Sequence, residues 1–309
     1  MLRLLREAAK EPLTIRLDLE QEGIVGFYEV SLARAGGEGG VCRVVSESAR
    51  WQGSYAIKEG KWDADQRLEN VQLPATADAL LLQTLSDARF QGLKEFVLGI
   101  EVYNPAPALL RQRFSRGGPA LMPGRGQQWA TALEKVLKSD SAGVFVVALH
   151  RITGDIVDVE VQPAAGELVI RCKHRSPDGK ERWAYADQES DGTLRSAALL
   201  TALLQKPSPT LIALEEPELA IHPGALEVIY DFIRSAQKHT QVIVTTHSPE
   251  LLDNFEADLV RVVDRSGTDT RITPMDEDQR TAVRDALVMT GRSSPTAQHH
   301  SEQFSPNRE

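Results

Sequence analysis

The sequence has little cysteine and no long apolar run. Its two cysteines, Cys42 and Cys172, lie far apart in strand-like segments, which argues against a disulfide framework or a cysteine-based metal site. No stretch of about 18 consecutive apolar residues occurs, so a membrane-spanning helix is not expected. The opening residues MLRLLREAAKEP are too few and too charged for a signal peptide. We therefore expect a soluble protein of the cytoplasm.

The chain also lacks an excess of positive charge. Its net charge at pH 7 is -9, with 26% charged and 41% hydrophobic residues among 309. This balance disfavours a general nucleic-acid coat, although it leaves room for a local basic groove or a basic partner. The composition is that of a globular protein, long enough for one large domain or two modest ones with a sizeable core.

Hydrophobic periodicity divides the chain into four regions. Alternating apolar and polar residues predict an antiparallel β lobe over residues 1–74. Apolar residues at helical spacing, followed by a Gly- and Pro-rich stretch, predict a helical middle region and loop over residues 75–126. Residues 127–290 are expected to form a C-terminal lobe, and the polar, aperiodic tail at residues 291–309 is expected to be disordered.

Inside the C-terminal lobe, the most informative stretch runs from Pro209 to Asp253. Two short apolar runs, TLIAL and QVIVTT, flank an amphipathic helix, which is typical of a βαβ unit in a parallel sheet. A further run, DLVRVVD at residues 258–264, is expected to add another parallel-type strand. The fold class predicted is therefore α/β, in which functional groups lie at the carboxyl ends of the strands.

Polar side chains follow both inner strands. The first strand ends in Glu215 and Glu216, and the second leads into His247 and Ser248. Adjacent carboxylates repel, and burying them is costly unless a positive group compensates. Mg²⁺ bound with nucleotide phosphates would do so, because it prefers oxygen ligands and keeps most of its waters. Taken singly, the acid pair is typical of a solvated turn and His-Ser-Pro of a helix cap.

The combination predicts a site for phosphoryl transfer, which needs positioning and charge neutralisation more than covalent chemistry. Glu215 would hold the metal, through water. Glu216 would orient or deprotonate the attacking water, and His247 would sense or contact the γ-phosphate.

A second candidate element, ESDGT, precedes the strongly helical run LRSAALLTALL. Ser190 or Asp191 is well placed to cap that helix, and Gly192 would let the backbone approach an anion closely. By itself this pattern is most often a capped turn.

The ordered combination of these segments resembles ABC-type ATPases of the structural-maintenance-of-chromosomes (SMC), RecF and OLD-like group, within the AAA family ATPases. LIALEEPELAIHP is similar to that group's Walker B region, VIVTTHSPELLD to its switch-histidine segment and ESDGTLRSAALLTALL to its signature segment. LSDARFQGLKEFVLGIEVYNPAPALLR resembles its middle region, so the similarity covers most of residues 13–270. The resemblance implies a partial P-loop NTPase fold of the ABC type: a parallel sheet with helices, an antiparallel β meander and a helical middle region.

The resemblance also implies roles for individual residues. Glu215 corresponds to the Mg²⁺-side acid, Glu216 to the catalytic base and His247 to the switch. In a head-to-tail dimer, the γ-phosphate of ATP held by one protomer would be contacted in trans by Ser190, Gly192 and Thr193 of the other. The implied partners are a second copy or a second ATPase half, with DNA or a DNA-processing protein beyond it. The implied processes are DNA repair, DNA maintenance or phage defence.

One part of the family pattern is missing. The phosphate-binding loop G-x-x-x-x-G-K-[ST] occurs nowhere in the sequence. GRGQQW at Gly124–Trp129 has glycines but no Lys-Ser/Thr after them. In the family this loop precedes the meander, so our hypothesis is that the chain starts after it, as a truncated product or one half of a split ATPase. ATP binding by the chain alone is then in doubt, and the parallel sheet would keep apolar edges that invite another chain.

Three alternatives follow from the same residues. The first is a non-hydrolysing pseudo-ATPase or regulatory subunit that dimerises with a complete ATPase. A serine hydrolase using Ser248, His247 and an acid is disfavoured, because G-x-S-x-G is missing and adjacent residues have the wrong separation for a triad. An OLD-like nuclease would need a further acidic metal-binding domain after the ATPase, for which the residues beyond the last expected strand are too few.

Overall fold

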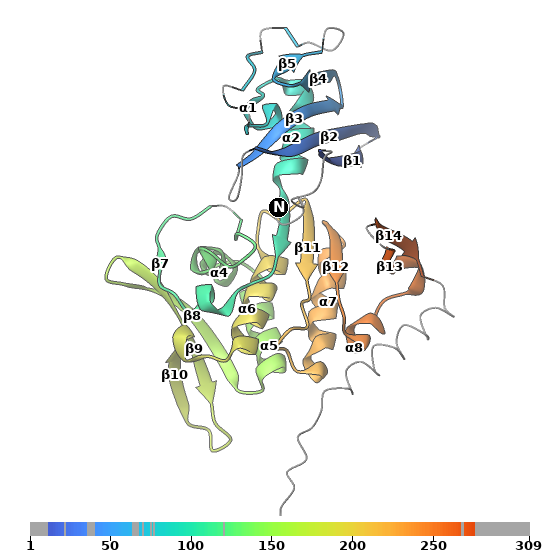
Figure 1. Cartoon of the computed structure of the whole chain (residues 1–309). Helices are drawn as coiled ribbons and strands as arrows, with labels where there is room; N and C mark the ends of the chain where they lie inside the picture. Colours follow the sequence, from blue (N-terminus) through green and yellow to red (C-terminus); the bar gives the residue numbers. More distant parts are fainter. Residues whose placement is uncertain are drawn as a thin grey trace, which may run out of the picture. The chain divides into compact units, whose positions relative to one another are not determined.

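The computed structural model describes residues 12–21, 23–35, 41–63, 68–69, 71–74, 76, 78–119, 121–266 and 269–275. The chain forms two compact units that divide between Ile100 and Glu101 (Figure 1). Each unit has its own hydrophobic core. The tail at residues 291–309, which we expect to be disordered, lies outside the described residues.

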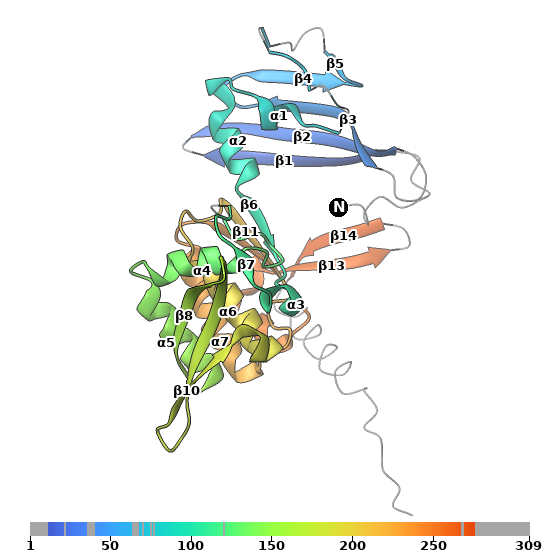
Figure 2. The ribbon, with the colours of Figure 1, turned by 90° about the vertical axis from the view of Figure 1, so that its left-hand side faces the viewer.

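The smaller unit is built on a five-stranded sheet whose spatial order follows the sequence, β1-β2-β3-β4-β5. All neighbouring strands are antiparallel, so the predicted meander is confirmed (Figure 2). The strands are β1 (Leu13–Gln21), β2 (Ile24–Ala35), β3 (Val41–Arg50), β4 (Ser54–Lys58) and β5 (Lys61–Trp62).

Short helices complete the core of this smaller unit. They are α1 (Leu81–Thr84), η2 (Ala88–Phe90) and α2 (Gln91–Leu98). Leu81, Phe90 and Leu93 are buried in one cluster with Tyr28 and Tyr55 of the sheet. The unit boundary therefore falls after residue 100, rather than at residues 74 and 126 as the periodicity suggests. The physical reason is that the helices bury their apolar faces against the meander instead of forming a separate middle region.

The larger unit contains a three-stranded sheet in the order β12-β11-β6. Its strands are β6 (Ile100–Tyr103), β11 (Leu211–Glu215) and β12 (Gln241–Thr245). β11 and β12 are parallel and in register from Leu211 opposite Gln241 to Glu215 opposite Thr245. The connection between them contains α7 (Leu226–Ala236), so the predicted βαβ unit is confirmed.

The two faces of this sheet differ in burial. Ile212 and Leu214 point into the main core, which they share with α6 (Asp191–Leu204) and α7. On the alternate positions, the side chains of Val102 and Ile243 are 48% and 47% exposed. Because successive residues of a strand point to opposite faces, helices cover one face and the other is open among the described residues.

A second, antiparallel sheet of the larger unit has β9 at its centre, paired with β7, β8 and β10. Helix α5 of this unit was not predicted from the sequence. The elements before α6 are α3 (Pro107–Leu110), β7 (Phe114–Ser115), α4 (Trp129–Leu137), α5 (Ala142–Thr153), β8 (Ile156–Ala164), β9 (Glu167–Arg175), β10 (Glu181–Tyr185) and η3 (Ala186–Gln188).

The segment expected to add a further parallel strand does not do so. β13 (Arg261–Ser266) pairs antiparallel with β14 (Asp269–Pro274) in a separate two-stranded sheet. The expectation is wrong because an apolar run identifies a strand but not its partner. Here the residues that follow β13 form its partner strand, β14. The remaining elements are η4 (Pro223–Ala225), α8 (Pro249–Leu252) and η5 (Ala257–Leu259). Among the described helices, none combines the length and apolar content that a bilayer crossing requires.

Candidate functional site

The acid pair lies where the sequence places it, at the carboxyl end of β11. Glu215 is the last residue of β11, is exposed, and stands opposite Thr245 of β12. The next residue, the half-buried Glu216, donates its backbone N–H to the carbonyl oxygen of Thr245 at 2.9 Å. The end of β11 and the start of the His247 segment are therefore neighbours at one edge of the parallel sheet.

The chain leaves β11 through a turn with left-handed backbone. Glu216 has φ +43° and Ala220 has φ +63°, although neither is glycine. The amide of Leu219 donates to the carbonyl of Glu216 at 3.1 Å, which closes the first part of this turn. A left-handed conformation costs a non-glycine residue about 1 kcal/mol or more, and such residues concentrate at functional sites.

The histidine segment, residues 246–248 after β12, is joined to the acid segment, residues 215–218, by side-chain hydrogen bonds. Thr246 Oγ1 and the backbone N–H of His247 both donate to Glu218 Oε1, at 2.8 and 3.0 Å. Ser248 accepts from the amide of Leu251 at 3.1 Å and so caps α8, as expected. Its hydroxyl also donates to Glu250 at 2.8 Å. A serine engaged as a cap supports the sequence argument against a hydrolase.

Two side chains that the sequence reading did not single out hold Glu215 in place. Asn104, the residue after β6, donates from Nδ2 to Glu215 Oε2 at 3.1 Å. The buried Arg195 of α6 donates to Asn104 Oδ1 at 3.3 Å and to the carbonyl of Pro105 at 3.0 Å. Since Arg195 can only donate, it fixes the Asn104 amide with its nitrogen toward the carboxylate.

Two features of the sequence could have identified Asn104 and Arg195. Asn104 follows a strand, as Glu215 and His247 do, and Arg195 is the one basic residue in the apolar run LRSAALLTALL. Burial lowers the pKa of the Arg195 guanidinium, and the charges of Glu216, Glu218 and Asp191 act in the opposite direction.

The start of α6 is a capped turn packed against the acid loop, residues 216–220 after β11. Ser190 Oγ accepts from the amide of Thr193 at 3.1 Å, which confirms Ser190 as the N-cap. A Cβ on Gly192 would lie 2.2 Å from the carbonyl oxygen of Ala220, so only glycine fits at this contact. Gly192 thus serves packing within the chain, while contact of Ser190, Gly192 and Thr193 with a nucleotide stays a prediction.

Charged side chains brace the residues just before α6. Arg111 forms an ion pair with Asp191 at 2.6 Å and donates to the carbonyl of Glu189 at 2.8 Å. The half-buried His174 places Nδ1 2.9 Å from Asp155 and Nε2 2.7 Å from Glu189. Burial disfavours the charged imidazole, but the hydrogen bonds to Asp155 and Glu189 outweigh it and raise the pKa of His174 above its ordinary value of 6.5.

The donor set fits Mg²⁺ that is bound together with nucleotide phosphates. Among the described residues, no group of three or more His, Cys, Asp or Glu side chains could hold a metal ion by itself. Mg²⁺ usually takes one or two carboxylates and fills its remaining positions with phosphate oxygens and water. Glu215, exposed and held by Asn104, offers one such carboxylate at the sheet edge.

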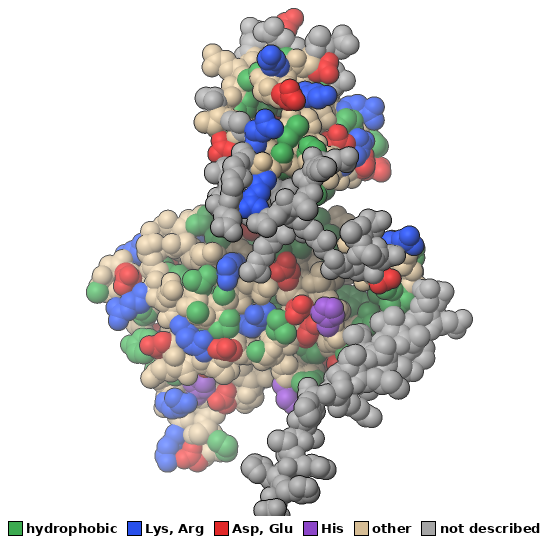
Figure 3. Space-filling model, viewed as in Figure 1, with side chains coloured by type: hydrophobic (Ala, Val, Ile, Leu, Met, Phe, Trp, Pro, Cys, Tyr) green, Lys and Arg blue, Asp and Glu red, His purple; other side chains and the backbone are tan. Residues whose placement is uncertain are grey.

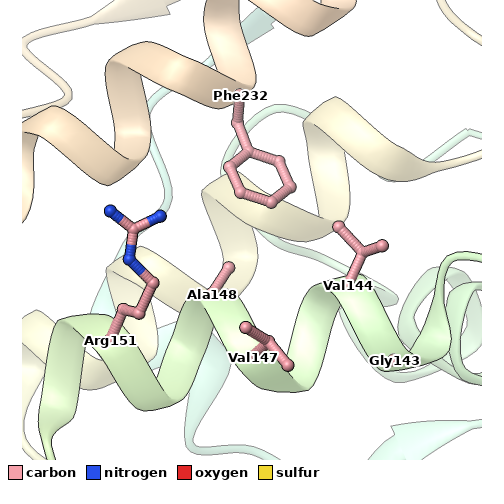
Figure 4. Close-up of a pocket in the computed structure, with 6 residues that line it drawn as sticks. All are labelled: Gly143, Val144, Val147, Ala148, Arg151 and Phe232. Atoms are coloured by element: carbon pink, nitrogen blue, oxygen red, sulfur yellow. The ribbon is translucent and has the colours of Figure 1, made fainter.

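The candidate site is separate from a shallow, mostly apolar groove of the larger unit. That groove, of about 300 Å³, lies between α5 and α7 and is lined by Gly143, Val144, Val147, Ala148, Arg151 and Phe232 (Figure 4). None of the residues at the carboxyl ends of β11 and β12 lines it. On the visible face of the larger unit, acidic and basic side chains are interspersed rather than gathered into one basic field (Figure 3).

These features define a class: an α/β protein with an acid site at the carboxyl edge of a parallel βαβ unit. Comparison with known families places the chain within that class. Residues 98–253, about half of the chain, match the family described as "AAA domain, putative AbiEii toxin, Type IV TA system", and the chain belongs to this family. It is thus a member of an AAA and ABC-like ATPase family. No curated protein matches the chain.

Solved structures of SMC head domains show a remote similarity. The SMC head domain from Thermotoga maritima is 15% identical, with 81% of this chain and 74% of that chain covered and a TM-score of 0.38. An SMC head bound to the C-terminal winged-helix domain of ScpA is 13% identical, with 82% and 76% covered and a TM-score of 0.44. An SMC head with coiled coil and joint from Pyrococcus yayanosii is 15% identical, with 50% of this chain and 29% of that chain covered and a TM-score of 0.40.

Proposed function

We propose that the chain carries the Walker B, signature and switch elements of an ATP-hydrolysing ABC-type ATPase. The observation that supports this most directly is the joining of two segments at one sheet edge. The acid segment at Glu215 and Glu216 and the segment of His247 are hydrogen-bonded to each other through backbone and side-chain atoms. The chain's membership in an AAA-type family supports ATP as the nucleotide.

Three side chains have separate proposed roles at this edge of the sheet. Glu215, steadied by Asn104, would hold Mg²⁺, with water between them. Mg²⁺, when bound, supplies positive charge against the phosphate oxygens. Glu216 would accept a proton from the attacking water at its carboxylate, and the imidazole of His247 would contact the γ-phosphate.

A partner is part of the proposal. Ser190, Gly192 and Thr193 would contact the γ-phosphate of ATP held by a second protomer, which is either another copy or a second ATPase half. The open sheet face bearing Val102 and Ile243 supports this, because exposed apolar strand residues favour coverage by another segment. Among the structures similar to this chain is one of SMC ATPases, described for their ATP-driven dimerisation and DNA-stimulated activation. By family analogy, the process served is DNA repair, DNA maintenance or phage defence.

A second candidate is a non-hydrolysing pseudo-ATPase or regulatory subunit that dimerises with a complete ATPase. The observation that favours it is the lack of a G-x-x-x-x-G-K-[ST] loop in the 309 residues. In that case the acid segment would retain its geometry without supporting turnover.

The deciding experiment measures ATP binding and hydrolysis by the chain with and without an N-terminal extension that carries a phosphate-binding loop. We expect binding and turnover only with the extension. Glu216→Gln should then reduce turnover at least about 100-fold while ATP binding persists. His247→Ala should lower turnover with little change in melting temperature, because His247 is exposed.

The matched control is Glu227→Gln in the first turn of α7, which removes an exposed acid without affecting the proposed chemistry. Equal turnover by Glu216→Gln and the parent would refute Glu216 as the base. ATP binding without any hydrolysis by the extended chain would favour the regulatory alternative.

A further inference from the structure

Glu218, the third acid of the EEPE segment, has a different environment from Glu215 and Glu216. We propose that Glu218 is a positioning residue whose carboxylate fixes the backbone of His247 relative to the acid pair. The effect on turnover rests on the proposed function, whereas the positioning itself is a property of the chain without nucleotide.

The geometry is that of one oxygen holding two donors from the neighbouring segment. Glu218 Oε1 accepts from Thr246 Oγ1 at 2.8 Å and from the amide of His247 at 3.0 Å. Thr246 Oγ1 accepts in turn from the amide of Ser248 at 2.9 Å. Three consecutive residues after β12 are therefore fixed, directly or through one hydroxyl, by a single carboxylate.

The anchor point of Glu218 is itself well fixed. Its carbonyl oxygen accepts from the amide of Ile221 at 3.0 Å, within the left-handed turn that follows Glu216. Two residues earlier, the amide of Glu216 donates to the carbonyl of Thr245 at 2.9 Å. The acid segment and the histidine segment are thus joined both through the backbone amide of Glu216 and through the Glu218 side chain.

The carboxylate of Glu218 lies in a partly buried place. Its second oxygen, Oε2, is buried and has no hydrogen-bond partner among the described residues. Leaving a buried polar atom unpaired is costly, so such an atom calls for an explanation. The nearby positive charge is Arg195 of α6, which interacts electrostatically with both Glu216 and Glu218. One buried cation therefore interacts with Glu216 and with the positioning acid Glu218.

Displacement of His247 would affect catalysis, because the rate depends on the exact position of catalytic groups. A shift of about 1 Å in a catalytic group can cost about 100-fold in rate. Without the Glu218 carboxylate, the amide of His247 loses its hydrogen-bond acceptor, and its backbone is then held only by the strand before it and the short α8 after it. The proposed γ-phosphate contact would then lose its fixed position relative to Glu216.

The test is hydrogen exchange at the His247 amide in the full chain without nucleotide. Glu218→Ala should speed exchange of this amide about tenfold or more, since a hydrogen bond to a charged acceptor is lost. Glu218→Gln keeps an oxygen acceptor and should leave exchange within about threefold of the parent. The control is Glu250→Ala, which removes the exposed acid beside Ser248 and should leave the His247 amide unchanged.

Thr246→Val provides an independent variant should Glu218→Ala fold poorly. It removes the hydroxyl shared by Glu218 and Ser248, so exchange of the Ser248 amide should rise, while the His247 amide keeps its bond to the Glu218 carboxylate and should stay protected. Unchanged protection of His247 in Glu218→Ala, or a loss in Glu218→Gln as large as in Glu218→Ala, would overturn the proposal. No nucleotide enters this assay, so such a result leaves the proposed ATPase function unaffected. In the extended enzyme, Glu218→Ala should lower kcat with KM for ATP unchanged, and Glu218→Gln should restore it.

Discussion

The two units use glutamate in opposite ways. In the smaller unit, Glu47 is 1% exposed and accepts hydrogen bonds from the hydroxyls of Tyr28 and Tyr55 and from the amides of Leu81 and Leu82. Its two oxygens are saturated by four donors of the same unit. The carboxylate therefore ties the sheet to the first turn of α1, with three donors at Oε1 and one at Oε2.

In the larger unit, the acids at the sheet edge are not saturated in this way. Glu215 is exposed and receives one side-chain hydrogen bond, from Asn104 at 3.1 Å. Glu216, beside it, uses its backbone rather than its carboxylate to bind the neighbouring segment. The comparison teaches that the number of donors around a carboxylate separates a structural acid from a candidate functional one better than its residue type or its sequence neighbours do.

The largest expected effect comes from removing the saturated acid. Glu47→Ala leaves two buried hydroxyls and two backbone amides without an acceptor, at a cost of about 1–3 kcal/mol for each such group. We expect the smaller unit to lose at least about 3 kcal/mol of unfolding free energy, measured by urea denaturation followed through its tryptophan fluorescence. Glu20→Ala, at an exposed position of β1, is the control. A loss below about 1 kcal/mol would contradict the structural reading of Glu47.

The next effect tests the packing of α6 on the acid loop. Gly192→Ala places a methyl group 2.2 Å from the carbonyl oxygen of Ala220, so helix or loop must move. We expect a loss of about 1–3 kcal/mol in the larger unit, as in other overpacked sites. Gly143→Ala in α5 meets open space and should be neutral or stabilising, since alanine favours helix by up to about 1 kcal/mol. Equal stability of the two variants would contradict the close contact.

His174 makes the stability of the larger unit depend on pH. Its pKa is raised in the folded state, so its contribution is fully present below pH 6.5 and is lost as pH rises through the folded pKa. Asp155 and Glu189 contact its ring nitrogens, Arg182 is its partner across the β9–β10 pair, and the Cys172 thiol interacts with the same two carboxylates.

His174→Gln should remove about 1.5–3 kcal/mol at pH 6 and less at pH 9, because hydrogen bonds to charged groups contribute in that range. Melting curves at both pH values measure the difference. His239→Gln, at an exposed position after α7, should change neither curve. A loss that is the same at pH 6 and pH 9 would rule out the protonated imidazole.

The smallest effect is expected at the unsaturated acids. Glu215→Gln and Glu216→Gln should each change the unfolding free energy by less than about 0.5 kcal/mol, as surface substitutions usually do. The same thermal melts measure it, with Glu47→Gln as the contrasting variant. A destabilisation comparable to that of Glu47→Gln would place Glu215 and Glu216 among the structural acids.

Sequence patterns predicted the part of the site that depends on local order. The strand runs ending at Glu215 and before His247, and the cap at Ser190, are short-range signals, and the structure has them as expected. Helix α5 was missed because its valine-rich segment AGVFVVALHRIT resembles strand sequence as much as helix. The predicted pairing of β13 was wrong because strand propensity does not determine which strands pair.

The contacts that complete the site could not be predicted in this way. Asn104 and Glu215 are separated by 111 positions, and Arg195 and Asn104 by 91. No periodicity links residues at such distances, since only the folded sheet brings them together. Glu218 could be noted as an acid, but its two donors lie beyond β12 and are identified only by the structure.

The left-handed backbone of Glu216 has a consequence for protein engineering. Replacement by glycine would relieve the φ of +43° and could raise the melting temperature, while deleting the proposed base. A library screened for heat resistance alone would therefore enrich glycine at position 216 and discard the proposed base. Selection must include turnover if residue 216 is to remain glutamate.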